Sequence, residues 1–320
     1  MRFPVPGFRF PVPGFTLPVL LAALVMAAAP AMAQGRFTNA RTETRAAGQG
    51  ADAIAREVRA VASRGDAVWV GYQMPMNVSP SGGPRHMCCY DNVVDAGSLG
   101  GCCGMCRLEN GSGVTMSNQL QSRDGRIVLE PPTEFLILAR VENGVVSRIR
   151  TFTPDCDVDA GNVLLVWLTG VRPEDSVSWL SDVINGTGTE SEKKSRVGDP
   201  AIAALAMHSA PSALTALIRF AKRAESSRLR GQALFWLAQR AGEQAVSTIA
   251  NAINDDPDTE VKKKAVFALS QLPKDEGVPK LIEVARTNRN PAVRKQAYFW
   301  LGQTNDPRAV AFFEEILSRK

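Results

Sequence analysis

Ala233-Leu234-Phe235-Trp236-Leu237-Ala238-Gln239 has two later copies, Ala265-Val266-Phe267-Ala268-Leu269-Ser270-Gln271 and Ala297-Tyr298-Phe299-Trp300-Leu301-Gly302-Gln303, each 32 residues after the one before. A fixed period of this length is typical of stacked repeats, whose units bury their apolar faces only against their neighbours. The period therefore predicts an α-solenoid of antiparallel helix pairs in the C-terminal half of the chain. Solenoids present extended surfaces, so the pattern indicates binding, although it specifies no ligand.

Each repeat is expected to hold two helices. In the first helix, Leu229, Ala233 and Leu237 recur at the spacing of one helical face, and Trp236 falls on the same stripe. The next two first helices have apolar residues at the same positions: Val261, Ala265, Ala268 and Leu269, then Val293, Ala297, Trp300 and Leu301. The second helices carry a stripe of their own: Val246, Ile249, Ala250 and Ile253; Val278, Leu281, Ile282 and Ala285; Val310, Phe313 and Leu317.

The start of each first helix has its own signal. Ser226, Asp258 and Asn290 stand at equivalent positions, and each side chain can accept a hydrogen bond from the free N–H groups of a first helical turn. Pro291 follows directly and suits the first position of a helix.

A fourth, degenerate repeat precedes these three. Its apolar positions match theirs: Ala201 and Leu205 in the first helix, and Leu214, Leu217, Ile218 and Ala221 in the second. Terminal units of a solenoid are often atypical, because one of their sides faces something other than a repeat. We therefore expect about four repeats of 32 residues over residues 199–320.

This segment resembles the HEAT-like repeats of bacterial proteins, especially the short repeats of phycobilisome lyases. The resemblance depends on Val293-Arg294-Lys295-Gln296-Ala297 followed by Leu301-Gly302, and on weaker forms at Val261-Lys262 and Leu229-Arg230. It implies an architecture rather than an activity, since such repeats serve scaffolds, lyases and hydroxylases alike. A lyase role would need a bilin pathway that nothing in the sequence indicates.

The hydroxylase chemistry known for some HEAT-like proteins is not supported by the sequence. Those enzymes bind a pair of irons through several His-Glu pairs. This chain has two histidines, His86 and His208, and Ser209 follows the second of them.

One aromatic position recurs in every clear repeat: Phe235, Phe267 and Phe299. At about 100° per residue, this position points about 200° away from Ala233, so the rings face away from the buried stripe. Lys263 and Lys295 precede two of the rings by four residues and lie on the same side of their helices. The solenoid therefore aligns the rings into a ladder that is edged with cations.

A second column of cations lies at the edge of the buried stripe: Arg230, Lys262 and Arg294. Aromatic and arginine side chains dominate the energetics of interfaces, so the ladder with its two columns of cations predicts a surface for a protein partner. The alternative is that neighbouring helices or the first domain cover the rings, since exposed apolar stripes are uncommon on monomers. The cations by themselves are also explained as solvated faces.

Residues 1–33 are predicted to be a secretory signal peptide, with cleavage after them. Arg2 and Arg9 provide a positive start, residues 17–29 are almost wholly apolar, and Ala31-Met32-Ala33 places small residues at the cleavage spacing. We therefore expect an exported protein, periplasmic or extracellular, and the alanine-rich leader favours a bacterial source. The alternative is an uncleaved membrane anchor, but the apolar run is short for a span, and no other segment could cross a bilayer.

The net charge of +5 is unevenly spread. The predicted signal peptide carries two arginines and no acidic residue, so its removal lowers the charge from +5 to +3. Residues 199–320 hold 18 Lys/Arg against 13 Asp/Glu, whereas residues 34–198 hold 17 against 19. Neither imbalance indicates a nucleic-acid partner, and export argues against one.

Residues 34–184 are predicted to form a small α+β domain. Helices are expected over residues 51–63 and 173–184. Strands are expected over residues 67–73, 126–129, 134–141, 145–152 and 163–168. Glu142-Asn143-Gly144 between two of these strands predicts a hairpin turn. The polar segment at residues 185–198 is the expected linker to the repeats.

All six cysteines lie in this domain: Cys88, Cys89, Cys102, Cys103, Cys106 and Cys156. An even number in an exported chain predicts disulfides first, although the sequence does not decide their pairing. Zinc binding with His86 is a second interpretation, which the missing doubled C-x-x-C pattern weakens. Redox exchange is a third, because Cys103-Gly104-Met105-Cys106 is a C-x-x-C motif, but it lacks a βαβ context.

Asp155-Cys156-Asp157-Val158-Asp159-Ala160-Gly161 alternates carboxylates as a calcium loop does. Its glycine falls one position late, and Val166 stands where the bidentate glutamate belongs, so a turn with solvated acids is the preferred interpretation. The sequence contains no Ser–His–Asp arrangement, phosphate loop or paired catalytic carboxylates that could be argued.

The sequence therefore predicts an exported, non-enzymatic scaffold that uses a HEAT-like solenoid to bind a protein partner, with neither cofactor nor metal. The alternative is an exported thiol-redox or metal-binding protein. In that case Cys103 and Cys106 would be the reactive pair, with the repeats as a substrate platform.

Overall fold

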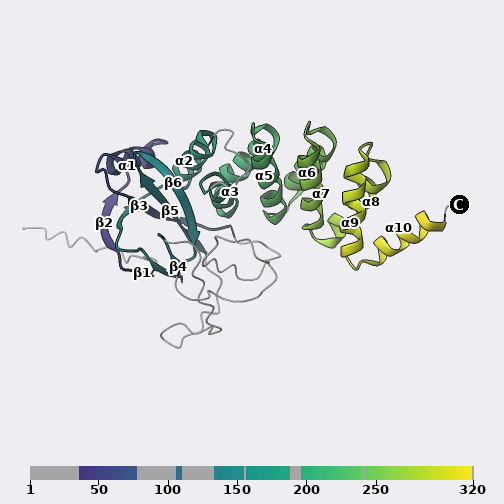
Figure 1. The fold of residues 1–320 in the computed structure, drawn as a ribbon, viewed down its shortest axis with the longest axis horizontal. Coiled ribbons are helices and arrows are strands. Elements are labelled where there is room, and N and C mark those ends of the chain that lie inside the picture. Colours follow the sequence, from purple (N-terminus) through teal and green to yellow (C-terminus); the bar gives the residue numbers. More distant parts are fainter. Residues whose placement is uncertain are drawn as a thin grey trace, which may run out of the picture. The chain divides into compact units, whose positions relative to one another are not determined.

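The structure is a computed structural model that describes residues 36–77, 106–109, 133–154, 156–187, 196–240 and 242–318. These residues form a mixed β-sheet with flanking helices, followed by a succession of helix pairs (Figure 1). The predicted signal peptide at residues 1–33 and the predicted strand at residues 126–129 lie outside the described residues.

The main sheet has five strands in the order β2-β8-β3-β5-β6. Their bounds are β2 Arg41–Ala46, β8 Leu164–Thr169, β3 Val68–Pro75, β5 Glu134–Glu142 and β6 Val145–Phe152. β3, β5 and β6 are antiparallel, whereas β8 is parallel to both of its neighbours. The predicted hairpin turn is confirmed, because Asn143 and Gly144 both have positive φ angles.

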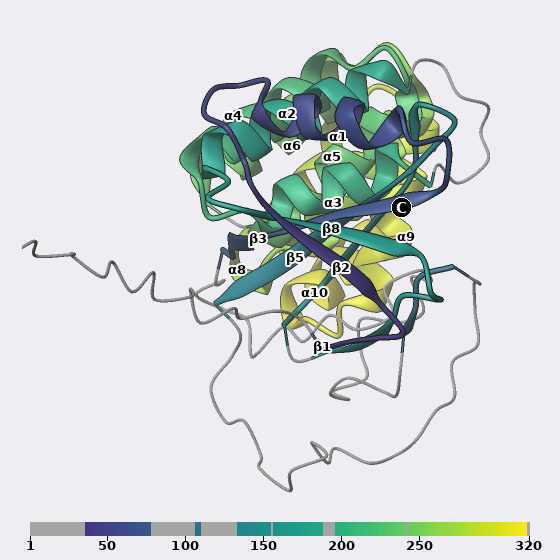
Figure 2. The same ribbon diagram turned by 90° about the vertical axis from the view of Figure 1, so that its left-hand side faces the viewer.

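Helices cover one face of this sheet. The predicted helices appear as α1 (Ala53–Ala62) and α2 (Pro173–Gly186), which lie side by side on one side of the strands (Figure 2). Because side chains alternate along a strand, Val70 and Tyr72 face these helices while Trp69 faces the other way.

A small sheet in the order β1-β7-β4 packs near the opposite face. Its strands are β1 Arg36–Thr38, β7 Asp157–Asp159 and β4 Cys106–Arg107. Phe37 contacts Trp167 of β8 with ring centroids 5.9 Å apart.

Part of the segment considered as a calcium loop is a strand, because β7 covers Asp157–Asp159. Its Asp159 carboxylate accepts hydrogen bonds from the Gly161 N–H at 2.8 Å and the Asn39 amide at 3.1 Å.

All eight predicted repeat helices are present. They are α3 Gly198–Met207, α4 Pro211–Arg223, α5 Ser227–Arg240, α6 Glu243–Asp255, α7 Thr259–Ser270, α8 Lys274–Thr287, α9 Pro291–Gln303 and α10 Pro307–Ser318. Each second helix packs against the next first helix, and first helices also pack against each other, as in a solenoid. The predicted fold of this part of the chain is confirmed.

The predicted stripes are buried, with an exception in the last helix. The aliphatic stripe residues of α5, α7 and α9 are buried, whereas Trp236 and Trp300 are half-buried. In α10 the prediction was wrong, because the Val310 and Leu317 side chains are 54% and 83% exposed. Among the described residues, no later helix packs over these two side chains.

The predicted N-caps are confirmed at two of the three first helices. Asp258 accepts a hydrogen bond from the Glu260 N–H at 2.8 Å, and Asn290 accepts one from the Ala292 N–H at 2.9 Å. At the first repeat, the Ser226 hydroxyl is 3.5 Å from the Leu229 N–H, at the outer limit of a hydrogen bond.

The sheet domain and the repeats share one hydrophobic core, which continues from the sheet through α2 and α3 into the solenoid. α2 runs to Gly186 and α3 begins at Gly198, so both helices reach into the segment predicted as a linker. The Ile149 N–H of β6 donates to the carbonyl of Arg196 at 2.9 Å. None of the described helices combines the length and the apolar character that a membrane span requires.

Candidate partner-binding surface

Five aromatic rings in contact cross α5, α7 and α9, and we call them the aromatic row. They are Phe235, Trp236, Phe267, Trp300 and Phe299. Phe235 stacks on Phe267 with centroids 5.9 Å apart and ring planes 4° apart. Phe267 meets Trp300 at 4.8 Å, and Trp300 meets Phe299 edge-on at 5.0 Å. Trp236 closes the other end against Phe235 at 5.2 Å. The structure thus brings the three predicted phenylalanines together with two tryptophans that the sequence assigned to the buried stripe.

Exposure changes along the aromatic row. Phe235 and Phe267 are half-buried, because they cover each other and lean on the tryptophans. Phe299 lies in α9, the first helix of the final repeat, and is 55% exposed. The interpretation that neighbours cover the rings therefore applies to two of the phenylalanines, while the third is open. The Trp300 Nε1 is buried and has no hydrogen-bond partner among the described residues.

The cations that edge the rings differ in their contacts. Lys263 forms an ion pair with Glu260 on its own helix at 3.0 Å. Lys295 is exposed and forms no ion pair within the described part of the chain. Lys264 lies outside the set of predicted contact residues. Its stem crosses to α5 and lies over Gly231, where any Cβ would overlap it.

The second cation column is engaged within the fold: Arg230, Lys262 and Arg294. The first member donates to the Asp256 carboxylate at 2.7 Å and to the carbonyl of Ala224 at 2.8 Å. The second donates to the carbonyl of Asn254 at 2.7 Å, and the third to that of Asn288 at 2.7 Å. Each therefore caps carbonyl groups at the C-terminal end of the preceding second helix. These contacts give the column a structural role, and we leave it out of the candidate surface.

A buried polar network that the sequence did not indicate lies between the sheet and the repeats. The Tyr72 hydroxyl is 3.0 Å from the Ser176 hydroxyl, which is 2.9 Å from Nε2 of His208. The His208 ring also meets Phe135 edge-on at 5.5 Å. Burial, with a smaller contribution from Arg240, lowers the pKa of His208 to about 4.

This network joins β3, α2 and the end of α3, and burial also raises the pKa of Tyr72. Its side chains are closed off from solvent, so the Ser176 hydroxyl is no nucleophile for a dissolved substrate. Its members are far apart in the sequence and share no spacing, which is why no sequence signal could have found them.

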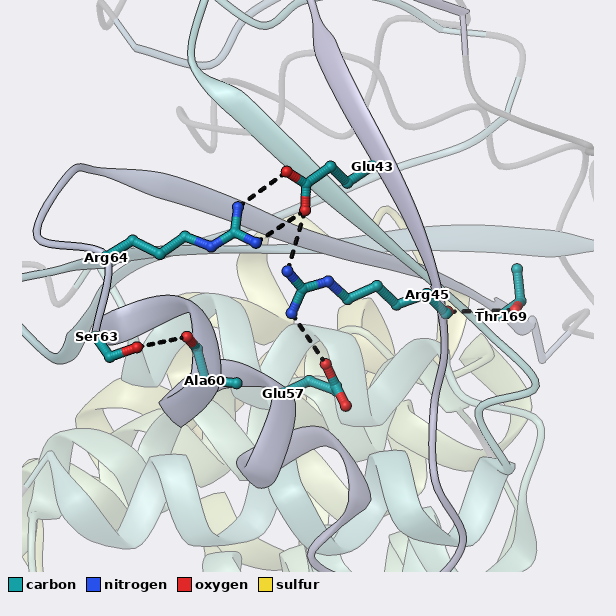
Figure 3. A network of polar contacts seen from close by, with 7 residues as sticks. All are labelled: Glu43, Arg45, Glu57, Ala60, Ser63, Arg64 and Thr169. Atoms are coloured by element: carbon teal, nitrogen blue, oxygen red, sulfur yellow. Dashed lines mark hydrogen bonds and ion pairs between the residues drawn. The ribbon is translucent and has the colours of Figure 1, made fainter.

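A second polar network surrounds Glu43 on the edge strand β2 (Figure 3). Its carboxylate accepts two hydrogen bonds from Arg64 and one from Arg45, each at 3.0 Å. Arg45 reaches on to Glu57 of α1 at 3.5 Å. The hydrogen bonds from Arg64 and then Arg45 lower the pKa of Glu43. An open pocket of about 460 Å³ is lined by Glu43 and Arg64 among other residues, and these two charges neutralise each other. We therefore assign the network a structural role, in which it holds β2 on α1.

Most of the cysteine cluster lies outside the described residues, namely His86, Cys88, Cys89, Cys102 and Cys103. The backbone of Cys106 belongs to β4, which pairs with β7. Cys156, just before β7, is fully buried, with its Sγ 3.5 Å from the Thr153 hydroxyl. In the part of the chain that the structure describes, no three His, Cys, Asp or Glu residues gather as a metal site would need.

Comparison with known proteins identifies the repeats. The family of HEAT repeats matches residues 214–290 and 246–320. No curated protein matches the chain. Among solved structures, human deoxyhypusine hydroxylase in complex with glycerol is similar, with 19% identity and a TM-score of 0.31 over 43% of each chain. The chain thus spans less than half of that enzyme. The C-terminal region consists of HEAT-like repeats, a class that generally mediates protein interactions.

Proposed function

We propose that this chain is a non-enzymatic scaffold that binds a protein partner on the aromatic row. The observation that carries the proposal is the continuity of five rings over three successive repeats, ending in a phenylalanine that is more than half exposed. Interface cores are enriched in aromatic anchors. Burying the exposed half of one phenylalanine contributes about 2 kcal/mol at the usual value per area.

Phe299→Ala is the direct test. We expect it to remove capture of the partner from an extracellular or periplasmic fraction, while the melting temperature stays within about 2 °C, since the ring is largely outside the core. Val145→Ala is the matched control, because Val145 is 62% exposed on the hairpin between β5 and β6. The same proteins captured by wild type and by Phe299→Ala would refute the proposal.

Phe267→Ala separates binding from packing within the aromatic row. This ring lies between Phe235 and Trp300, so we expect its removal to lower the unfolding free energy by about 2–3 kcal/mol. Phe299→Ala should cost less than about 1 kcal/mol on the same urea titration. Equal losses would mean that both rings belong to the core and that Phe299 is no docking residue.

We further infer that the chain is exported and that its cysteines form disulfides. The leader at residues 1–33 and the even number of cysteines support this. So does the burial of Cys156 beside the strand that pairs with β4. Thiol titration of the denatured, non-reduced protein should find no free thiol. The measured mass of the exported protein should equal that of a chain starting at Gln34. Two reducible thiols at Cys103 and Cys106 would favour the thiol-redox alternative instead.

A further inference from the structure

Charge is segregated between the two sets of helices in the repeats. The first helices α5, α7 and α9 together carry eight Lys/Arg and one Asp/Glu. The second helices α6, α8 and α10 carry four Lys/Arg and seven Asp/Glu. The net charge of the whole repeat region, with 18 Lys/Arg and 13 Asp/Glu, does not reveal this separation. The helices that hold the aromatic row are therefore basic, and their partners in each repeat are acidic.

Two of these cations are available beside the aromatic row. Arg228 pairs with Asp199, and Lys263 pairs with Glu260. Lys264 and Lys295 form no ion pair within the described residues, and both are exposed. Lys264 lies one helical turn before Phe267, and Lys295 one turn before Phe299. Lys295 lies beside the open end of the aromatic row, and Lys264 lies beside its α5 and α7 rings. No carboxylate of the described chain forms an ion pair with either lysine.

Amide side chains lie one helical turn after the rings, whereas the lysines lie one turn before them. A glutamine follows each phenylalanine by four residues and lies on the same helical face: Gln239, Gln271 and Gln303. Gln271 and Gln303 are exposed. A glutamine amide offers both donors and an acceptor, which suits the N–H and C=O groups of an extended polypeptide. Aromatic edges carry partial positive charge, which also favours carboxylates.

We infer that the segment bound on the aromatic row is an acidic polypeptide with apolar side chains. Its carboxylates meet Lys264 and Lys295, its apolar side chains cover Phe299, and its backbone meets the glutamine column. The inference depends on the proposed function, because it specifies the partner of the same surface. A single-stranded nucleic acid is disfavoured, since Phe235 and Phe267 are stacked on each other and their facing surfaces cannot stack on bases.

Fluorescence anisotropy on the full chain tests the inference with defined probes. The probes are a 12-residue peptide of alternating Glu and Leu, its Gln-for-Glu and Lys-for-Glu counterparts, and a single-stranded DNA 12-mer. We expect the acidic peptide to bind at least about ten times more tightly than the neutral one, and its affinity to fall as salt is raised. The peptide with lysines should show no binding.

Two charge-reversed proteins localise the effect. Lys264→Glu with Lys295→Glu should lower the affinity for the acidic peptide at least about tenfold, because both changes place a repelling negative charge beside the aromatic row. Lys274→Glu with Lys280→Glu changes the net charge equally on the second helix α8 and should leave the affinity within about twofold. Equal losses from both pairs would overturn the inference in favour of attraction by net charge alone.

The remaining outcomes separate the inference from the proposed function. If neutral and acidic peptides bind equally and Phe299→Ala abolishes both, the acidic class is wrong and the aromatic surface stands. If Phe299→Ala leaves acidic-peptide binding intact, the proposed function of the row fails. Tighter binding of the DNA, lost in the Lys264→Glu, Lys295→Glu protein, would replace the polypeptide with a nucleic acid. Binding of none of the probes at 1 mM would also overturn the inference.

Discussion

At the scale of the residue, the burial of His208 makes the stability of the protein depend on pH. Its Nε2 contacts Ser176, whereas its Nδ1 is buried with no partner among the described residues. Arg240 is the charged group nearby, and it donates to the backbone carbonyl of His208 at 2.8 Å rather than to the ring. A protonated ring would therefore carry an unsatisfied charge in the core.

We predict that the protein loses stability as the pH falls from 6.5 towards 4. The pKa of His208 is about 4 in the folded state, below the ordinary value of 6.5 that applies when unfolded. The unfolded chain takes up a proton first, so the contribution is complete above pH 6.5 and declines below it. Over this window the loss reaches about 3 kcal/mol.

Urea titrations of wild type and His208→Gln between pH 8 and pH 4 measure this effect. Glutamine keeps a hydrogen-bonding group near Ser176 but does not titrate. Carboxylates contribute equally to both proteins, so the difference between the two curves isolates the histidine. Parallel curves would show that the ring is protonated as easily in the fold as in water.

Single residues also mark the limit of what the sequence could predict about the site. The helical angle placed the three phenylalanines on one side correctly, because that angle needs only the helix. It could not show that Trp300 leans out to Phe267, since the contact joins two repeats. Nor could it show that Arg230 forms an ion pair with Asp256, which lies 26 residues later in the chain.

At the scale of the element, the cation column predicts unequal effects of one substitution. Arg230→Met breaks a nearly buried pair with Asp256 as well as a helix cap, so we expect a loss of about 2–3 kcal/mol. Arg294→Met removes contacts to carbonyl groups alone and should cost about 1 kcal/mol. Urea unfolding at neutral pH measures both. Similar losses would mean that the ion pair adds nothing to the cap.

Two helical glycines are expected to respond to alanine in opposite directions. A Cβ on Gly277 of α8 would lie 2.5 Å from the Leu269 carbonyl oxygen of α7, and a backbone atom cannot move aside. Gly277→Ala should therefore destabilise the protein by about 1–3 kcal/mol. Gly302 of α9 has nothing within 4 Å, so Gly302→Ala should stabilise it by about 0.5–1 kcal/mol. Stabilisation by both changes would show that α7 and α8 can separate.

The elements divide into those that the sequence specifies and those that it does not. The repeat helices follow from period, stripe and caps, which are local signals. β2 was missed because it is an edge strand of alternating charged residues, without the apolar run that marks a buried strand. α10 carries an apolar stripe, but burial of a stripe needs a neighbour, which the stripe itself cannot specify.

At the scale of the molecule, the sheet domain and the first repeat are joined more closely than a linker implies. The Asn77 N–H donates to the Met207 carbonyl at 2.6 Å, and the Ser209 N–H donates to that of Pro75 at 3.1 Å. The chain at the end of β3 thus pairs with the chain at the end of α3, with Met76 opposite His208. These contacts join two regions that composition separates, and composition cannot show pairing across 130 residues of sequence.

We predict that cutting the chain between these regions does not release them. The test is to cut the chain once between α2 and α3, at an inserted protease site. These two helices pack against each other, and the hydrogen bonds of Ser176 with Tyr72 and His208 connect α2 to β3 and to the end of α3. The two fragments should elute together in size-exclusion chromatography under native conditions and separate in urea. The nicked protein should also unfold in one transition, seen equally by far-ultraviolet circular dichroism and tryptophan fluorescence. Fragments that elute apart without denaturant would mean that the shared core contributes little, and that the sheet domain and the repeats are independent domains.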